Sequence, residues 1–199
     1  MKSLLSKMQN VTRSSRGFTL IEILISLFIM VVLSTAVFVS FRTGDKNLAL
    51  ERSAHQMAQH IRKAMEMSLQ AEQSSVCGDP SDLSGYGLYV DEGSPTTYLL
   101  YANCNGEDSE GYDASQDESV TTFSLDEAIE ISDVSNGENS DKMWGIVFFP
   151  PDPRIEICTN DPCNGANQVN SGLIELRVKS DPSFTRTITI NQRGTIDVD

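Results

Sequence analysis

The sequence predicts an α+β fold, in which a long N-terminal helix packs on an antiparallel β-sheet domain. Residues 18–41 form an uninterrupted apolar run, and residues 50–69 repeat apolar side chains at helical spacing. After Pro80 the chain holds short runs rich in aromatic and β-branched residues, which are typical of strands. Because strands that follow one helix must cover an apolar face, we expect the helix and the sheet to share a core.

The apolar run from Phe18 to Phe41 contains one charged residue, Glu22. A helix of this length reaches about 36 Å, enough to cross a hydrocarbon core of about 30 Å. The preceding residues, Met1 to Gly17, carry four basic side chains and no acidic one. By the positive-inside rule this end stays in the cytoplasm and the C-terminal domain lies outside it. We therefore predict a single membrane-spanning segment over residues 18–43.

The order of these features differs from that of a secretory signal, which has a small-residue cleavage site after its apolar core. Here Gly17 precedes the apolar run, and no A-x-A site follows it. The basic leader and the motif R-G-F-T-L-I-E, Arg16 to Glu22, resemble the class III leader of type IV pilins and type II secretion pseudopilins. The resemblance implies that a membrane peptidase removes residues 1–17, cutting between Gly17 and Phe18, and that the new N-terminal Phe18 is methylated.

Glu22 has two interpretations. A carboxylate within an apolar span is unfavourable, by about 2.5–3.5 kcal/mol at a helix centre and less near its end. Glu22 either stays hydrated at the interface or meets a cation inside the membrane. The resemblance supplies such a cation, the free amine of Phe18 on the same or a neighbouring subunit. After cleavage that amine would lie four residues from Glu22 on one helix face. We favour a role for Glu22 in assembly.

Residues 44–76 continue the helix as an amphipathic stalk, with no proline before Pro80. Gly44 is the expected point of bending. His55 and His60 fall on polar or boundary positions, and we interpret both as surface residues. Apolar or small side chains recur every three or four residues and predict one buried face: Leu50, Ala54, Met57, Ile61, Ala64, Met65, Ser68 and Leu69.

Residues 77–199 are expected to form the extracytoplasmic β domain. Nine segments have strand composition and turn-forming neighbours. In Thr187-Ile188-Thr189-Ile190 the apolar side chains alternate with polar ones, as in a half-buried strand. Together with the leader, this gives a pilin-like architecture. The predicted strands are Tyr86–Val90, Thr97–Ala102, Val120–Leu125, Ile129–Ile131, Trp144–Phe149, Arg154–Cys158, Gly172–Lys179, Thr185–Asn191 and Thr195–Val198.

All four cysteines lie in the exported part, and an even count in an oxidising compartment indicates two disulfides. Cys158 and Cys163 flank a short turn-rich loop that can close locally. Cys77 is then left to pair with Cys104, which ties the end of the helix to an early hairpin. The sequence has no C-x-x-C pattern, which disfavours a zinc site.

The chain is acidic, with a formal net charge of −13. Loss of the leader would leave 11 basic and 28 acidic side chains, so the mature protein is expected to repel nucleic acid. The loop 103–118 is dense in carboxylates and could hold Ca²⁺, as some relatives of the family do. Its spacing does not match the EF-hand pattern, and we favour a solvated acidic loop.

No catalytic or nucleotide-binding motif is present, so we expect a structural subunit and not an enzyme. Within the family, the helix 50–72 and the segments 145–150 and 187–194 look most like the pseudopilin H and FimT-like minor group. The basic DNA-binding motif of some members is reduced here to Arg193-Gly194, and the kinking proline of the membrane helix is missing.

The resemblance thus implies a minor pilin or pseudopilin that waits in the inner or cytoplasmic membrane. It would then assemble through its apolar helix into a type IV pilus or a type II secretion pseudopilus, at the cell surface or in the periplasm. Its expected partners are other pilin subunits, the prepilin peptidase, the assembly platform and ATPase, and membrane lipid before assembly. The alternative is a membrane-anchored binding module that never polymerises.

Overall fold

The computed structural model of the chain divides into two compact units, Met1–Thr43 and Gly44–Asp199. The residues that the structure describes are 17–70, 77–79, 82–104, 111–136, 140–141, 143–150, 154–158 and 169–199. At positions 36, 38–43, 140, 141, 143 and 144 the description covers the backbone only.

One helix, α1 (Leu20–Leu69), runs through both units and contains 50 residues. The sequence analysis placed the start of the helix at Phe18, so the observed helix begins two residues later. It is continuous through Gly44, the residue at which we expected a bend. Residues 71–76, the end of the predicted stalk, lie outside the described residues.

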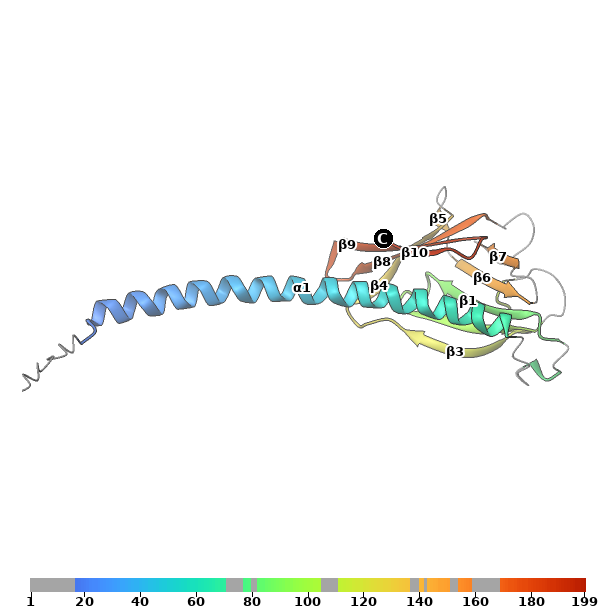
Figure 1. The fold of residues 1–199 in the computed structure, drawn as a ribbon, viewed down its shortest axis with the longest axis horizontal. Coiled ribbons are helices and arrows are strands. Elements are labelled where there is room, and N and C mark those ends of the chain that lie inside the picture. Colours follow the sequence, from blue (N-terminus) through green and yellow to red (C-terminus); the bar gives the residue numbers. More distant parts are fainter. Residues whose placement is uncertain are drawn as a thin grey trace, which may run out of the picture. The chain divides into compact units, whose positions relative to one another are not determined.

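The second unit contains the strands, which are drawn from green to red in Figure 1. Every one of the nine predicted strands is present, and β4 and β9 each extend four residues beyond the predicted bounds. The described residues add one short strand, β5, that the sequence did not predict. The strands are β1 (Gly85–Asp91), β2 (Thr97–Asn103), β3 (Glu118–Ser124), β4 (Ile129–Ser135), β5 (Ser140–Asp141), β6 (Met143–Phe149), β7 (Arg154–Cys158), β8 (Ser171–Val178), β9 (Asp181–Asn191) and β10 (Ile196–Val198).

The strands form two antiparallel sheets where the sequence analysis expected one. The first sheet has the order β3-β2-β1-β6-β7 and the second has the order β10-β9-β8-β4-β5. In the second sheet, β8 shows the alternation that this arrangement needs, because every other residue from Gly172 to Val178 is buried. On its outward side, Arg177 stands opposite Glu130 of β4, and its Nε lies 2.7 Å from Oε1 of Glu130.

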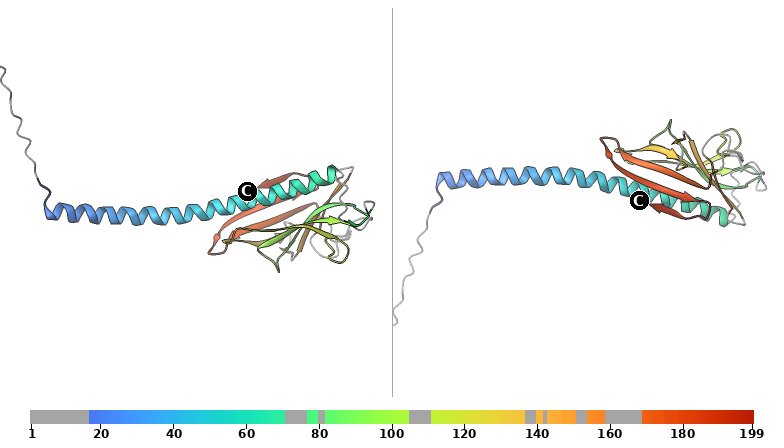
Figure 2. Two further views of the ribbon diagram at one scale, coloured as in Figure 1. Left: turned by 90° about the horizontal axis from the view of Figure 1, so that it is seen from below. Right: turned by 90° about the horizontal axis from the view of Figure 1, so that it is seen from above.

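Both sheets contribute to one hydrophobic core, which also includes a face of α1. In both views of Figure 2, the later part of α1 runs alongside these strands. Leu50, Ala54, Met57, Ile61 and Ala64 are fully buried, as the helical spacing predicted. The helix therefore joins the two sheets into a single domain, in the α+β arrangement expected of a pilin-like protein.

The end of the predicted buried face differs from expectation. Leu69 is 49% exposed, because the helix ends at this residue. Ser68 is buried, as predicted, and its hydroxyl oxygen accepts a hydrogen bond from the backbone N–H of Tyr86 at 2.9 Å. On the same helix, the Arg62 guanidinium donates to the backbone oxygen of Ile196 at 3.0 Å. Polar bonds thus attach α1 to β1 and to β10.

His60 is not the ordinary surface residue that the sequence indicated. Its ring stacks on Phe123 of β3, with the centroids 3.7 Å apart, and its Nδ1 lies 2.8 Å from the hydroxyl oxygen of Tyr98. His60 is half-buried, because Phe123 of β3, the edge strand of the first sheet, lies against its ring. His55, in contrast, is exposed as predicted.

This environment predicts a pH-dependent stability. Burial, and secondly the charge of Lys63, lower the pKa of His60 from its ordinary value of 6.5. The unfolded chain therefore binds a proton before the folded chain does as the pH falls. The stabilising contribution of His60 is present in full above about pH 6.5 and is lost as the pH falls through the lowered pKa.

We expect the free energy of unfolding to fall less between about pH 7.5 and about pH 5 in His60→Gln than in the unaltered chain. Denaturant titrations at the two pH values measure this difference. His55→Gln is the matched control, because that histidine is exposed on the same helix. An unchanged pH dependence in His60→Gln would show that His60 does not contribute to it.

Candidate functional site

The candidate site is the start of α1, where the sequence places the processing and assembly residues. Gly17, Phe18 and Thr19 precede the helix in non-helical backbone, and Phe18 is 77% exposed. A Cβ atom at Gly17 would meet no atom of the described residues within 4 Å, apart from those of its chain neighbours. The predicted cleavage site thus lies in open, non-helical chain immediately before the first helical residue, Leu20.

Thr19 is the N-terminal cap of α1. Its backbone oxygen accepts hydrogen bonds from the N–H groups of Glu22 at 3.1 Å and Ile23 at 3.2 Å. Its side-chain Oγ1 also accepts from the same backbone N–H of Glu22, at 3.3 Å, as an N-cap side chain does in the first turn of a helix. The cap explains why the helix begins at Leu20 and not at Phe18.

The sequence analysis missed this role, although the signal was present. Thr19-x-x-Glu22 has the spacing of a capping box. Glu22 lies in the first turn of α1, where a carboxylate interacts favourably with the positive end of the helix dipole. Glu22 is therefore placed well for the helix itself as well as for the assembly role that the resemblance implies.

The first unit presents large apolar side chains on all sides of the helix. Those from Phe18 to Leu33, and Val37, are between 49% and 79% exposed. A continuous apolar surface of this kind exceeds what soluble monomers expose, so it needs a covering partner. No helix within the described ranges is long and apolar enough to be identified as a membrane span. Membrane insertion of residues 18–43 stays a prediction.

Three hydroxyl groups in the described part of this apolar stretch are bonded to the helix itself. Ser26 donates to the backbone oxygen of Glu22 at 2.8 Å, and Ser34 donates to that of Met30 at 2.7 Å. Thr35 donates to the backbone oxygen of Val31 at 2.7 Å. Because each hydroxyl has a partner within the helix, these residues can enter an apolar environment without leaving a donor unsatisfied.

Comparison with protein families adds the deciding observation. Residues 12–38 match the family model described as the prokaryotic N-terminal methylation motif. The chain carries the methylation motif of the type IV pilin and pseudopilin family. This match includes Gly17, Phe18, Thr19 and Glu22 together with most of the exposed apolar helix. Comparisons with curated proteins and with solved structures found no match.

The pilin-type motif accounts for the site described above. It implies an N-terminal membrane anchor, processing by a prepilin peptidase and the involvement of an assembly machinery. Pilins and pseudopilins are structural subunits and not enzymes. The fold agrees with the motif, because α1 continues beyond the matched residues and its later part packs on antiparallel sheets.

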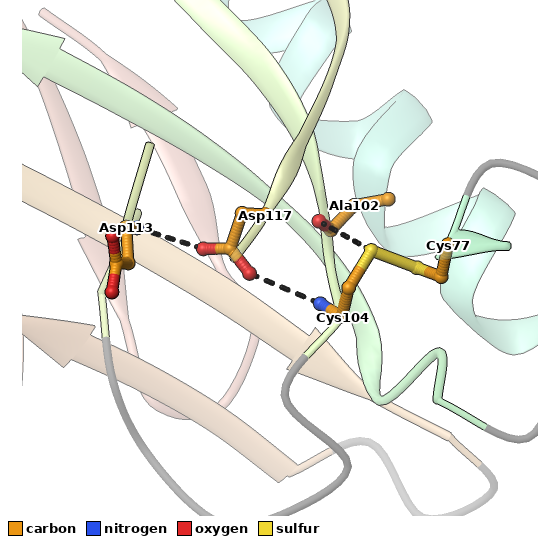
Figure 3. The surroundings of a disulfide bond; sticks show 5 residues. All are labelled: Cys77, Ala102, Cys104, Asp113 and Asp117. Carbon is orange, nitrogen blue, oxygen red and sulfur yellow. Dashed lines mark hydrogen bonds between the residues drawn. A yellow bond between two sulfur atoms is a disulfide. The ribbon is translucent and has the colours of Figure 1, made fainter. Parts of the chain in front are cut away.

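In the second unit, a disulfide joins Cys77 to Cys104, the longer of the two predicted pairings. Figure 3 shows that Asp117 lies next to this bond. Oδ1 of Asp117 accepts a hydrogen bond from the backbone N–H of Cys104 at 3.0 Å, and Oδ2 accepts one from that of Asp113 at 2.8 Å. Cys158 is also disulfide-bonded, and its predicted partner, Cys163, lies outside the described residues.

The acidic loop 103–118 is described in part, with residues 105–110 outside the description. Two of its carboxylates are bonded to the protein. Asp117 holds the two backbone N–H groups named above, and Asp113 accepts hydrogen bonds from Ser115 and Gln116. Within the described part of the chain, no group of three or more His, Cys, Asp or Glu side chains is arranged to hold a metal ion.

Proposed function

We propose that the chain is a minor pilin or pseudopilin subunit of a type IV pilus or a type II secretion pseudopilus. The prepilin peptidase cuts between Gly17 and Phe18 and Phe18 is methylated. The apolar helix then leaves the membrane and packs against like helices in a filament. The observation that carries this proposal is the methylation motif over residues 12–38, which coincides with an open cleavage site and an exposed apolar helix.

The same observations support the topology and the partners. The helix 18–43 anchors the protein in the inner or cytoplasmic membrane, and the acidic domain lies outside the cytoplasm. Other pilin subunits cover the apolar helix after assembly, in place of lipid. The platform protein and its ATPase supply the work, since the sequence contains no nucleotide-binding motif. The resemblance to the pseudopilin H group favours a minor over a major subunit.

Glu22 is proposed as the residue that sets the register of assembly. After cleavage the amine of Phe18 precedes the cap residue Thr19, and Glu22 follows in the first helical turn. A carboxylate in this position can pair with its own amine or with that of a neighbouring subunit. Pairing between subunits removes an uncompensated charge from an apolar environment, so it favours one alignment of adjacent helices.

Processing tests the proposal directly. Co-expression with a prepilin peptidase, followed by mass spectrometry, should give a mature chain that begins at methylated Phe18. Gly17→Val should slow cleavage by roughly two orders of magnitude, because a branched side chain displaces the peptide bond by about 1 Å in the peptidase site. Gly44→Val is the matched control, since a Cβ at Gly44 also meets no atom within 4 Å.

An intact leader in the co-expressed chain, or cleavage after Phe41, would contradict the proposal. The alternative function, an anchored binding module that never polymerises, predicts that the leader is retained. The N-terminal mass therefore separates the two functions without the need to observe a filament.

A further inference from the structure

The first sheet has a second apolar face, on the side opposite α1. Side chains alternate along its strands, so Tyr86 and Leu88 enter the shared core while Tyr89 points the other way. On this outer face, Tyr101, Val147 and Phe149 form a separate buried cluster. Three partly buried residues pack against the cluster: Tyr89, Leu99 and Tyr112.

Three tyrosines fix the shape of this face. The ring of Tyr101 is fully buried and lies against Gly87, where a Cβ atom would come within 2.6 Å of it. Tyr112 meets Tyr101 edge-on, with the centroids 5.1 Å apart. Tyr112 also lies 5.1 Å from the ring of Tyr89, at an interplanar angle of 41°. The rings of Tyr89 and Tyr112 are thus held in place by their neighbours and leave a recess between strands.

That recess is a groove of about 150 Å³ that crosses β1, β2 and β3. The tyrosine rings and Leu99 supply its apolar part, and hydroxyl groups and the Asp91 carboxylate supply its polar part. Asp91 is fixed by its own turn, because its Oδ1 accepts a hydrogen bond from the backbone N–H of Gly93 at 2.8 Å. The main lining residues are Tyr89, Asp91, Thr97, Leu99, Tyr112 and Thr122.

The lining of the groove is acidic in the part of the chain that the structure describes. Its lining residues in the described part of the chain include one carboxylate and no basic side chain. Burial raises the pKa of the neighbouring Tyr101, and the charges of Asp117 and Glu156 raise it further. These two carboxylates therefore act on the same face of the sheet. A cationic ligand would be attracted here and an anionic one repelled.

The same face already holds one cation from the chain itself. The Arg154 guanidinium lies over the ring of Phe149, 4.5 Å from its centroid, and its Nε is 3.6 Å from Oε1 of Glu156. On β6 and β7, an aromatic ring and a neighbouring carboxylate thus hold the guanidinium of Arg154 together. Tyr89, Tyr112 and Asp91 present the same combination in the groove, where the described lining residues include no basic side chain.

We propose that the groove formed by Tyr89, Tyr112 and Asp91 binds an arginine side chain presented by a partner protein. The planar guanidinium can stack on a tyrosine ring while it donates to the carboxylate of Asp91. The hydroxyl groups of Thr97 and Thr122 offer further acceptors. Binding needs only the folded domain, so it does not depend on leader processing or on filament assembly.

The full chain, purified in detergent and labelled with 3-fluorotyrosine, provides the test. Its five tyrosines give resolvable fluorine resonances that Tyr→Phe variants assign. Titration with N-acetyl-arginine methylamide should shift the resonances of Tyr89 and Tyr112 in a saturable way and leave that of Tyr86 in place. The citrulline analogue, which has the same shape without the charge, and methyl glucoside should produce no such shift.

Asp91→Asn should weaken binding of the arginine probe about fivefold, while its amide oxygen can still accept the Gly93 bond. Asp126→Asn is the matched control, because Asp126 accepts a similar bond from Ala128 outside the groove. Higher salt should also weaken binding to the unaltered chain. The proposal is overturned if the arginine probe causes no shift, if citrulline or the glucoside binds equally well, or if neither Asp91→Asn nor salt weakens binding.

Discussion

Glu22→Val is expected to abolish incorporation into filaments while the chain is still inserted and processed. The substitution removes the single charge from the apolar run, so membrane insertion should be unaffected or improved. It also removes the carboxylate that is proposed to pair with the amine of a neighbouring Phe18. Quantifying the subunit in sheared filaments relative to the membrane fraction measures the effect, and we expect a loss of at least about tenfold, equivalent to about 1.4 kcal/mol.

Two further variants test whether the loss of incorporation results from the missing charge of Glu22. Glu22→Gln keeps the size of the side chain and removes its charge, so it should fail in the same way. Glu51→Val makes the same change at an exposed glutamate in the domain part of α1 and should assemble normally. Normal incorporation of Glu22→Val would mean that Glu22 is a hydrated interfacial residue whose main contribution is to the first turn of the helix.

Removal of the Cys77–Cys104 disulfide is the second change with a large expected effect. The bond closes a loop with a sequence separation of 27, for which the chain-entropy model gives a stabilisation of about 3 kcal/mol. The double variant Cys77→Ser/Cys104→Ser should therefore lower the melting temperature of the domain by roughly 6–12 °C. Thermal unfolding followed by circular dichroism measures this shift.

The double variant Cys158→Ser/Cys163→Ser is the comparison. These residues are close in sequence, so the loop that they are predicted to close is short and the expected stabilisation is smaller, about 2 kcal/mol. Non-reducing peptide mapping of the unaltered protein should recover Cys77 linked to Cys104 and Cys158 linked to Cys163. Crossed pairing would contradict the strand arrangement, and four free thiols would contradict export to an oxidising compartment.

The strands could be predicted from the sequence because their alternation is local. Segments such as Thr187–Ile190 show the period of two within a few residues. The strand β5 was not predicted because it has only two residues, Ser140 and Asp141, neither of which favours strands. The division of the strands into two sheets was not predicted either, because the alternation within a strand does not indicate which other strand it pairs with.

The cap of α1 and the environment of His60 differ in how far the sequence could predict them. Thr19 could have been recognised as a cap from its spacing to Glu22 alone. His60 could not, because its environment comes from Tyr98 and Phe123, which follow it by 38 and 63 positions in the chain. Asp117 is similar, since its carboxylate was visible in the sequence but its bonds to Cys104 and Asp113 depend on the fold. Long-range contacts, and not the residue types, decided these roles.

The two hydrogen bonds that the Asp117 carboxylate accepts have a consequence for how the segment between Cys104 and Asp113 can vary in sequence. Cys104 is fixed by the disulfide and by Oδ1 of Asp117, and Asp113 is fixed by Oδ2 of the same carboxylate. Both ends of the intervening segment are therefore anchored independently of its own residues. Each doubling of such a segment costs only about 0.6 kcal/mol of loop entropy. We expect insertions between residues 105 and 110, including a peptide tag, to leave the domain folded, which makes this segment a practical place to label the subunit.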